Sequence, residues 1–180
     1  CTAGVPWGAL RVPHHPTGRA LRRAFNGPLA ARSANPSGRI SATTAAHVMA
    51  GLGDRIAAVV DDGPCAVGLE STIINLAGPA PTLLRAGGLP VEEIEALLTT
   101  PLATQSGSDV IAPGQLASHY APSAKVRLNA ETASEGELLL GFGPMDCTLN
   151  LSATSDLTQP AASLFDHLHQ LDATGAPIAL

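Results

Sequence analysis

Short apolar runs alternate with polar stretches rich in Gly and Pro along most of the chain, a pattern that predicts many short helices and strands. The order of apolar positions and end signals predicts helices at residues 16–25, 43–53, 90–98 and 160–173. β-Branched or apolar runs predict strands at residues 8–13, 28–31, 55–63, 70–76, 81–88, 125–130, 137–143, 147–152 and 176–180. For the second helix we expect Ser41 or Thr43 as the N-cap and Gly51 or Gly53 as the stop.

The regular pattern is lost between Thr100 and Ser123, where Thr, Gln, Ser, Gly, Asp and Pro dominate. We therefore expect a first domain at 1–100, a linker at 101–124 and a second domain at 125–180. Mixed strands and helices in the first domain predict an α+β or α/β fold, and their alternation in the second predicts the opening of a small α/β domain. The chain lacks an initial Met and stops in an apolar run, so we expect a fragment of a longer protein.

Composition narrows the possible function classes. The 180 residues are 45% hydrophobic and 14% charged, which is typical of a globular protein with a core. The net charge of −5 argues against a strong electrostatic grip on nucleic acid. The three Cys residues are far apart with no disulfide or zinc pattern, and no apolar run approaches the ~20 residues that span a bilayer. We therefore expect a cytoplasmic protein without a membrane partner.

A Ser-rich loop, "SANPSGRIS", is the first candidate site. It offers small hydrogen-bonding side chains from Ser33, Asn35, Ser37 and Ser41, and Gly38 lets the backbone approach a ligand closely. The loop lies between an expected strand and an expected helix, where Ser and Gly in front of a helix form anion sites. An ordinary turn followed by an N-cap also explains these residues, and the residues alone favour that interpretation.

Polar groups at the ends of strands form two further candidates. In "GLESTIINL", Ser71 and Thr72 begin a strand and can bind a polar ligand, although an ordinary strand edge has the same composition. Arg11 and Arg85 each stand at the end of an apolar strand. A charge there is paired, lies at the mouth of a site, or extends to solvent.

Histidines and cofactor motifs add little. His14, His15 and His47 could act as ligands or acid–base groups, but scattered His residues are more often surface or core groups. His167 and His169 are two apart on an expected helix, so they point to nearly opposite sides. Zinc, dinucleotide, P-loop and nucleophile-elbow motifs are all absent, so we expect no metal site built by the chain itself.

Five motifs in this order and spacing are more informative together: "LRVPHHP", "SANPSGRISAT", "GLESTIINL", "LLRAGG" and "PGQLASHYAP". Over essentially the whole chain, the series resembles the YrdC-like threonylcarbamoyl-AMP synthases in their long, two-domain form. The linker motif, Pro113–Pro122, separates this form from single-domain relatives. The resemblance implies an α/β protein overall: part of an α+β-like YrdC catalytic domain, with a twisted mixed sheet and helices, and then the start of a small Rossmann-like α/β domain.

The activity that the resemblance implies is nucleotidyl transfer. Family members combine L-threonine, bicarbonate and ATP, release pyrophosphate and make threonylcarbamoyl-adenylate. That adenylate is the donor for the modification of adenosine 37 in tRNA. Mg²⁺ would accompany ATP, and the downstream tRNA threonylcarbamoyl transferase machinery would be the partner, with weak binding to double-stranded RNA left open.

Residue roles also follow from the resemblance. Arg11 would hold the threonine carboxylate, and the Ala31 backbone and Ser71 would complete the amino-acid pocket. Arg85 would meet the ATP phosphates and is the expected catalytic residue, and Tyr120 would reach from the linker onto the nucleotide. The expected ATP-binding residues are Ser33, Asn35, Ser41, Arg85 and Tyr120.

The chain departs from the family pattern at several places. Trp7 stands where relatives usually carry a small polar residue beside ATP, and Arg32 stands where Pro or a small residue is common. The family's basic Lys-x-Arg stretch would lie upstream of Cys1, so we expect these 180 residues alone to be poorly active. His119 is expected to be mainly structural.

Two other functions stay open. One is a YrdC-like module that binds RNA or nucleotide without making the adenylate, although the negative net charge and the lack of interleaved aromatic and basic residues speak against RNA. The other is a carbamoyltransferase of the hydrogenase-maturation type, which also contains a YrdC-like domain. The "HYAP" linker and the α/β region after it favour the synthase.

Overall fold

The computed structural model describes residues 8–104, 120–156 and 158–180, with no side-chain description at residues 158 and 159. By compactness the chain divides into two units, residues 1–33 and residues 34–180, which are considered separately. In the described part of the chain, no helix is long and apolar enough to cross a membrane.

Within residues 8–33 of the first unit there is one helix, α1 (Pro16–Phe25), in the place where the sequence predicts it. Proline occupies the first turn, where its missing N–H costs nothing, and Asn26 ends the helix in the left-handed region with φ 53°. The expected strands at residues 8–13 and 28–31 are wrong, since neither segment is a strand. The side chains of Leu10 and Val12 are almost fully exposed. An apolar run does not form a strand by composition alone, because a strand also needs neighbouring residues to pack against.

The second unit begins with the Ser-rich loop and helix α2 (Ala45–Leu52), followed by a short 3₁₀ turn, η1 (Gly53–Arg55). The N-cap is Thr44, whose side chain accepts a hydrogen bond from the His47 N–H, so the expectation of Ser41 or Thr43 is wrong. Thr44 stands directly before the first helical residue and has an extended backbone, with φ −136° and ψ 160°. Gly53 is the C-cap, as one of the two expected stops.

A mixed three-stranded sheet follows, in the order β1-β2-β3. Its strands are β1 (Ile73–Asn75), β2 (Thr82–Arg85) and β3 (Ala103–Thr104), with helix α3 (Val91–Leu98) between the last two. β1 and β2 are antiparallel, and β2 and β3 are parallel. The sequence predicts β1, β2 and α3, but β3 falls in the expected linker, and the strand expected at 55–63 is wrong.

A parallel four-stranded sheet forms the C-terminal part, in the order β4-β7-β5-β6. Each strand is a shorter version of an expected one: β4 (Val126–Arg127), β5 (Leu138–Gly141), β6 (Leu149–Asn150) and β7 (Ile178–Ala179). Helix α4 (Thr158–Asp172) connects β6 to β7, which lie on opposite sides of β5. The expected elements are therefore present, as three strands, a helix and a further strand, although strand and helix do not alternate strictly. The chain is a mixed α/β protein.

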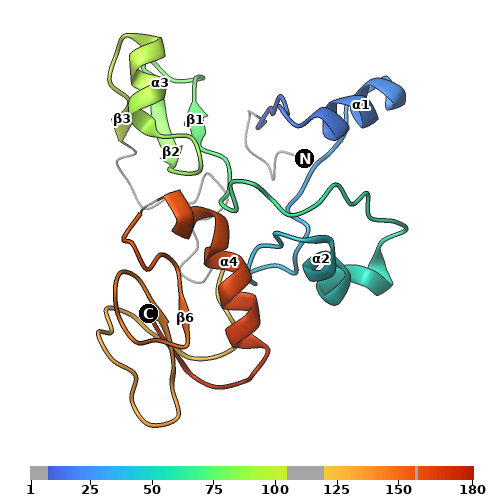
Figure 1. Cartoon of the computed structure of the whole chain (residues 1–180). Coiled ribbons are helices and arrows are strands. Elements are labelled where there is room, and N and C mark those ends of the chain that lie inside the picture. The colour runs from blue at the N-terminus through green and yellow to red at the C-terminus, as the bar shows by residue number, and fades with distance from the viewer. Residues whose placement is uncertain (1–7, 105–119, 157) are drawn as a thin grey trace. The chain divides into compact units, whose positions relative to one another are not determined.

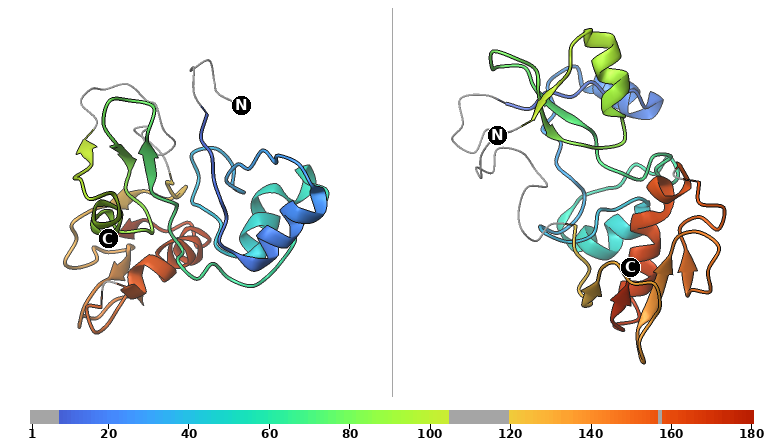
Figure 2. Two further views of the ribbon diagram at one scale, coloured as in Figure 1. Left: turned by 90° about the horizontal axis from the view of Figure 1, so that it is seen from above. Right: turned by 90° about the vertical axis from the view of Figure 1, so that its left-hand side faces the viewer.

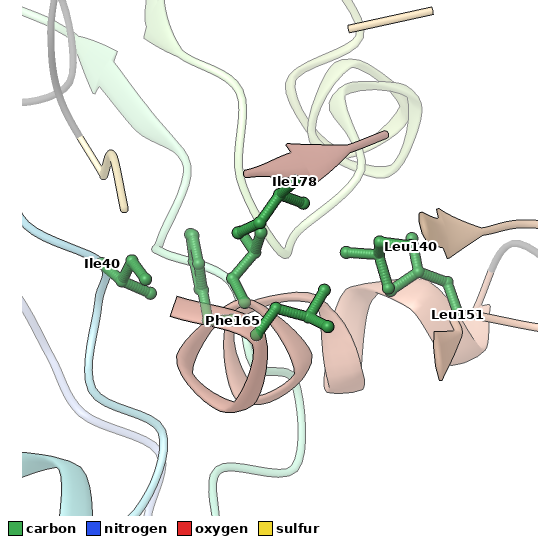
Figure 3. Packing of buried hydrophobic residues seen from close by; sticks show 7 residues of the cluster. Ile40, Leu140, Leu151, Phe165 and Ile178 are labelled. Atoms are coloured by element: carbon green, nitrogen blue, oxygen red, sulfur yellow. The ribbon is translucent and has the colours of Figure 1, made fainter. Parts of the chain in front are cut away.

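The core of the second unit lies between this sheet and α4 (Figure 3). It also receives Ile40 from the Ser-rich loop, more than 80 positions earlier in the chain. Burial of each such side chain contributes roughly 1.5–3 kcal/mol. The buried cluster consists of Ile40, Leu140, Leu151, Phe165, Leu168, Leu171 and Ile178. The loop of residues 34–44 is thus fixed to α4 by the same core that holds the parallel sheet.

Helices α2 and α4 lie side by side (Figure 1 and Figure 2). The ring of His47 on α2 stacks on that of His169 on α4, with centroids 3.9 Å apart and planes inclined by 22°. His47 Nε2 also lies 3.5 Å from a carboxylate oxygen of Asp166. The contacts of His47 with His169 and Asp166 therefore connect α2 to α4 by polar side chains, beside the apolar core.

Candidate functional site

Arg85, the last residue of β2, is the centre of the candidate site. Its Nε and Nη2 donate to the Ser71 carbonyl oxygen at 3.1 and 2.8 Å, and Nη2 lies 3.4 Å from Ser71 Oγ. Its Nη1 donates to the phenol oxygen of Tyr120 at 2.8 Å. The antiparallel pairing that places Arg85 opposite Ile73 brings it to the start of β1, where Ser71 lies.

Tyr120 connects this guanidinium to the core. Its ring meets the ring of Phe165 with centroids 5.8 Å apart and an interplanar angle of 52°, and its backbone has a positive φ of 56°. Burial, and the negative charge of Glu70, raise the pKa of the Tyr120 phenol, while Arg85 opposes that rise. Tyr120 therefore stays a neutral phenol at physiological pH and presents its oxygen to Arg85.

Ser41 lies on a second side of the site. It is buried, and its hydroxyl donates a hydrogen bond to the Glu70 carboxylate. Its carbonyl oxygen is 3.0 Å from His169 Nε2. The Glu70 carbonyl oxygen accepts from the Gly88 N–H at 2.8 Å. Both the side chain and the backbone of Ser41 are therefore held.

The "RAGG" motif at the end of β2 packs closely against the "LEST" segment, and Gly87 has no room for a side chain there. A Cβ at Gly87 would lie 2.3 Å from the Glu70 carbonyl oxygen and 2.5 Å from the Thr72 nitrogen. Such distances do not occur between real atoms, so the position requires glycine. The first Gly after Arg85 allows the close approach that brings Glu70, Ser71 and Arg85 together.

The Ser-rich loop contacts the residues that follow Tyr120. The Ala121 N–H donates to the Gly38 carbonyl at 3.0 Å, and Arg39 pairs with Ala121 in a parallel bridge. A hollow of about 190 Å³ is lined there by Ser37, Gly38, Arg39, Ala121 and Pro122.

Asn35 stands beside that hollow in sequence and has an unusual environment. Its Nδ2 donates to the Arg39 carbonyl at 2.8 Å. Its Oδ1 is buried and receives no hydrogen bond from the described part of the chain. A buried acceptor without a donor is costly, and a ligand N–H or a water would satisfy it.

Four of the expected site residues are brought together: Ser41, Ser71, Arg85 and Tyr120. Arg11, Ala31 and Ser33 belong to the first unit, where all three are exposed. Trp7 and Pro113–His119, including His119, lie outside the described residues. The expectations for these positions stay predictions.

Sequence reasoning missed several residues that touch the site. The sequence analysis does not select Glu70, although an acid directly before two hydroxyls is a usable signal. Phe165 and His169 come from α4, and no local pattern reports which loop a helix face meets.

His47, on α2, is a titratable group beside the site with a lowered pKa. Burial and the charge of His169 lower the pKa of His47, and Asp166 partly opposes them. His47 is therefore mainly neutral near pH 7. Its Nδ1 accepts from the Thr43 N–H at 3.3 Å, so the ring braces the segment that runs from Ser41 to the helix N-cap.

The arrangement suits a ligand with anionic oxygens and polar donors. A guanidinium offers bidentate hydrogen bonds to phosphate or carboxylate, and the hydroxyls of Ser41 and Ser71 and the Tyr120 phenol are further polar groups beside it. In the described residues, no group of three or more His, Cys, Asp or Glu residues could hold a metal ion. The guanidinium, hydroxyls and phenol are thus groups that can bind and orient charged oxygens.

Family models match nearly the whole chain. The model described as "Telomere recombination" (Sua5_yciO_yrdC) matches residues 1–87, and the model described as "Threonylcarbamoyl-AMP synthase, C-terminal domain" matches residues 89–180.

Individual relatives carry the same description. The threonylcarbamoyl-AMP synthase of Bacillus subtilis is 45% identical over 132 residues, which cover 71% of this chain and 38% of that protein. The threonylcarbamoyl-AMP synthase of Pyrococcus abyssi is 34% identical in an alignment of 201 positions that covers 99% of this chain and 59% of the relative. The aligned part of the chain therefore spans less than two thirds of the length of each of these relatives.

A solved structure has the same fold. The crystal structure of P. abyssi Sua5 complexed with L-threonine superposes with a TM-score of 0.84 at 32% sequence identity, covering 99% of this chain and 59% of that one. The arrangement of both sheets and of α4 in the second unit is therefore that of a known fold.

Proposed function

Because the chain belongs to the family of two-domain threonylcarbamoyl-AMP synthases, we propose that its protein makes L-threonylcarbamoyl-adenylate and pyrophosphate from L-threonine, bicarbonate and ATP. The product would serve the threonylcarbamoyl modification of adenosine 37 in tRNA. The P. abyssi relative crystallised with L-threonine, which supports an amino-acid substrate of this kind.

The observation that carries the proposal is the connected set Ser71–Arg85–Tyr120, with Ser41 and Glu70 beside it. Residues expected to touch threonine and residues expected to touch ATP share one guanidinium. A condensation of two substrates needs such adjacency, because both must be held within reach of one another.

The proposed reaction has two steps, and different residues would hold threonine and the phosphates. Nitrogen of threonine attacks the carbon of bicarbonate or of carbon dioxide derived from it, giving a carbamate and water. A carbamate oxygen then attacks the α-phosphorus of ATP, and the bond to the pyrophosphate oxygen breaks. Arg11, the Ala31 backbone and Ser71 would hold threonine, and Arg85 would stabilise charge on the phosphoryl oxygens.

The nucleotide would be bound by residues from several segments. Asn35 has a buried oxygen in need of a donor, which the adenine or ribose of ATP could supply. Tyr120 would close over the nucleotide and keep water from the labile adenylate. The residues proposed to line the ATP site are Ser33, Asn35, Ser41, Arg85 and Tyr120.

Mg²⁺ would enter with ATP as substrate. The ion usually binds substrate phosphates and keeps several waters, so it needs few protein ligands.

The same family membership supports a division of labour along the chain. We propose a YrdC-like catalytic region at residues 1–100, a linker at 101–124 and a Rossmann-like region at 125–180, in a cytoplasmic protein that passes its product to the tRNA threonylcarbamoyl transferase machinery. The parallel sheet with its crossover helix supports the Rossmann-like description.

The test uses the full-length protein with ATP, bicarbonate and each amino acid in turn. Threonine-selective release of pyrophosphate together with threonylcarbamoyl-adenylate is the expected result. RNA binding without turnover would favour the nucleotide- or RNA-binding module instead. A requirement for carbamoyl phosphate would favour the carbamoyltransferase.

A further inference from the structure

One stripe of α4 contacts three segments of the candidate site. The contacting positions are Ala161, Phe165 and His169, which are spaced by four residues and so lie on one face of the helix. Their partners are Gly68, Tyr120 and Ser41 respectively. The partners are far apart in sequence, so a single helix face is what brings them to a common support.

The first contact brings backbone against backbone. Gly68 has a positive φ of 73°, and a Cβ there would lie 2.4 Å from the Ala161 carbonyl oxygen and 2.7 Å from that of Ala162. No other residue fits without moving α4. Gly68 begins the "GLES" segment, so α4 sets the position of the chain that leads into Glu70 and Ser71.

The second contact supports Tyr120 from behind. Phe165 is buried in the core, with 6% of its surface exposed, and its ring is tilted against the ring of Tyr120. The other end of Tyr120 accepts the hydrogen bond from Arg85. A rigid ring on one side and a guanidinium on the other leave the phenol little freedom.

The third contact holds Ser41 by its backbone. His169 Nε2 is 3.0 Å from the Ser41 carbonyl oxygen, which has no hydrogen to give, so this nitrogen is the donor. The His169 ring is itself fixed by stacking on His47. The Ser41 hydroxyl remains directed to Glu70.

We propose that Phe165 and His169 are positioning residues for the nucleotide, acting through Tyr120 and Ser41. This inference rests on the proposed function. It assigns the C-terminal helix a part in binding ATP: the site residues are correctly placed before the nucleotide arrives because α4 has already ordered them. Preorganisation of this kind lowers the entropy lost on binding and the barrier that follows.

The experiment compares four variants of the full-length protein: Phe165→Ala, Phe165→Tyr, His169→Ala and His169→Gln. The two alanine variants should raise KM for ATP roughly tenfold while KM for threonine changes less than about twofold. Phe165→Tyr keeps a ring and His169→Gln keeps an N–H donor, so both should recover most of the loss. A calorimetric titration with a non-hydrolysable ATP analogue should give the same ranking without turnover.

Matched controls separate positioning from loss of stability. Leu171→Ala removes a side chain from the same helix and the same buried cluster, and Gln170→Ala changes an exposed neighbour. If Phe165→Ala and His169→Ala behave like Leu171→Ala at equal folded fraction, or if KM for threonine rises as much as KM for ATP, the inference is wrong. Should Phe165→Ala fail to fold, the comparison of His169→Ala with His169→Gln decides alone.

The two proposals fail in different ways. A wild-type protein that makes no threonylcarbamoyl-adenylate contradicts the proposed function. A wild-type protein that makes it, with the alanine variants unchanged in ATP affinity, contradicts only the positioning role of α4.

Discussion

Arg85 and Tyr120, 35 residues apart in sequence, share a hydrogen bond of 2.8 Å between Nη1 and the phenol oxygen. The same guanidinium binds the Ser71 carbonyl, and the same phenol ring packs on Phe165. One pair of side chains therefore connects the strand that ends at Arg85 to the core around α4.

Tyr120→Phe tests this hydrogen bond and little else. The ring stays against Phe165, so the free energy of unfolding should change by less than about 1.5 kcal/mol. The rate of adenylate formation should fall roughly tenfold, since Arg85 loses the partner that orients it. Steady-state kinetics and urea unfolding check the two parts.

Tyr120→Ala is the companion variant. It also removes the ring, so the adenylate should leak and hydrolyse, and ATP consumption should exceed adenylate yield. An unchanged ratio of pyrophosphate to adenylate would argue against a role for Tyr120 as a cover.

Ser41→Ala removes the donor that meets the Glu70 carboxylate. Because Ser41 is buried, the change should lower the free energy of unfolding by about 1–3 kcal/mol and weaken ATP binding together. Glu70→Gln, which keeps an acceptor oxygen, should retain more of both. A Ser41→Ala protein as stable and as tight for ATP as wild type would mean that this contact does not matter.

His47 makes stability depend on pH. Its pKa is lowered by burial and by His169, with Asp166 opposing, so the unfolded chain takes up the proton more readily than the folded one. Stability should be highest above pH ~6.5 and fall as the pH drops from there through the lower folded pKa. Urea midpoints at about pH 7.5 and about pH 5.5 measure the change.

The matching variants are His47→Gln and His14→Gln. His14 is exposed in the first unit and serves as the control. The pH dependence should shrink in His47→Gln and persist in His14→Gln. Equal dependence in both variants would assign it to other groups.

The ion pair between Arg127 on β4 and Glu137, directly before β5, should make the stability of the parallel sheet depend on pH. The Glu137 oxygens accept from the Arg127 guanidinium, with Nε to Oε1 at 3.1 Å, and a carboxylate oxygen also accepts from the Ser134 N–H at 2.8 Å. The hydrogen bond from Arg127, more than any other cause, lowers the pKa of Glu137 to about 2. The stability that this pair adds should therefore be present above pH ~4.5 and disappear as the pH falls toward 2.

Arg127→Ala should bring the pKa of Glu137 back toward its ordinary value, and Arg127→Lys should do so less. An NMR titration of the Glu137 carboxyl carbon measures both. A pKa that stays near 2 in Arg127→Ala would show that Ser134 is sufficient.

Much of the fold follows from local sequence. Helix α1 occupies its expected residues, because the Pro at its start and the polar end signal are local. The strands of the parallel sheet are found because apolar runs between turns coincide with buried positions such as Leu139 and Ile178. The failed strands at 8–13, 28–31 and 55–63 have the composition of strands without a neighbour to pair with.

The candidate site also has a part that the sequence predicts and a part that it does not. Ser41, Ser71, Arg85 and Tyr120 belong to motifs that stand out in the sequence, and the structure brings them together. Their supports do not stand out: Phe165 and His169 have the pattern of an ordinary amphipathic helix. Which loop that helix face meets depends on the packing of Ile40 and α4 in one core, and tertiary contacts of this kind leave no local signal.

The most direct test of the central claim measures threonine- and bicarbonate-dependent pyrophosphate release by the full-length protein and by its Arg85→Ala variant. The account predicts adenylate formation by the wild type, a loss of roughly a hundredfold or more in Arg85→Ala, and partial activity in Arg85→Lys. Pyrophosphate release that does not depend on threonine, or an Arg85→Ala variant as fast as wild type, would contradict it.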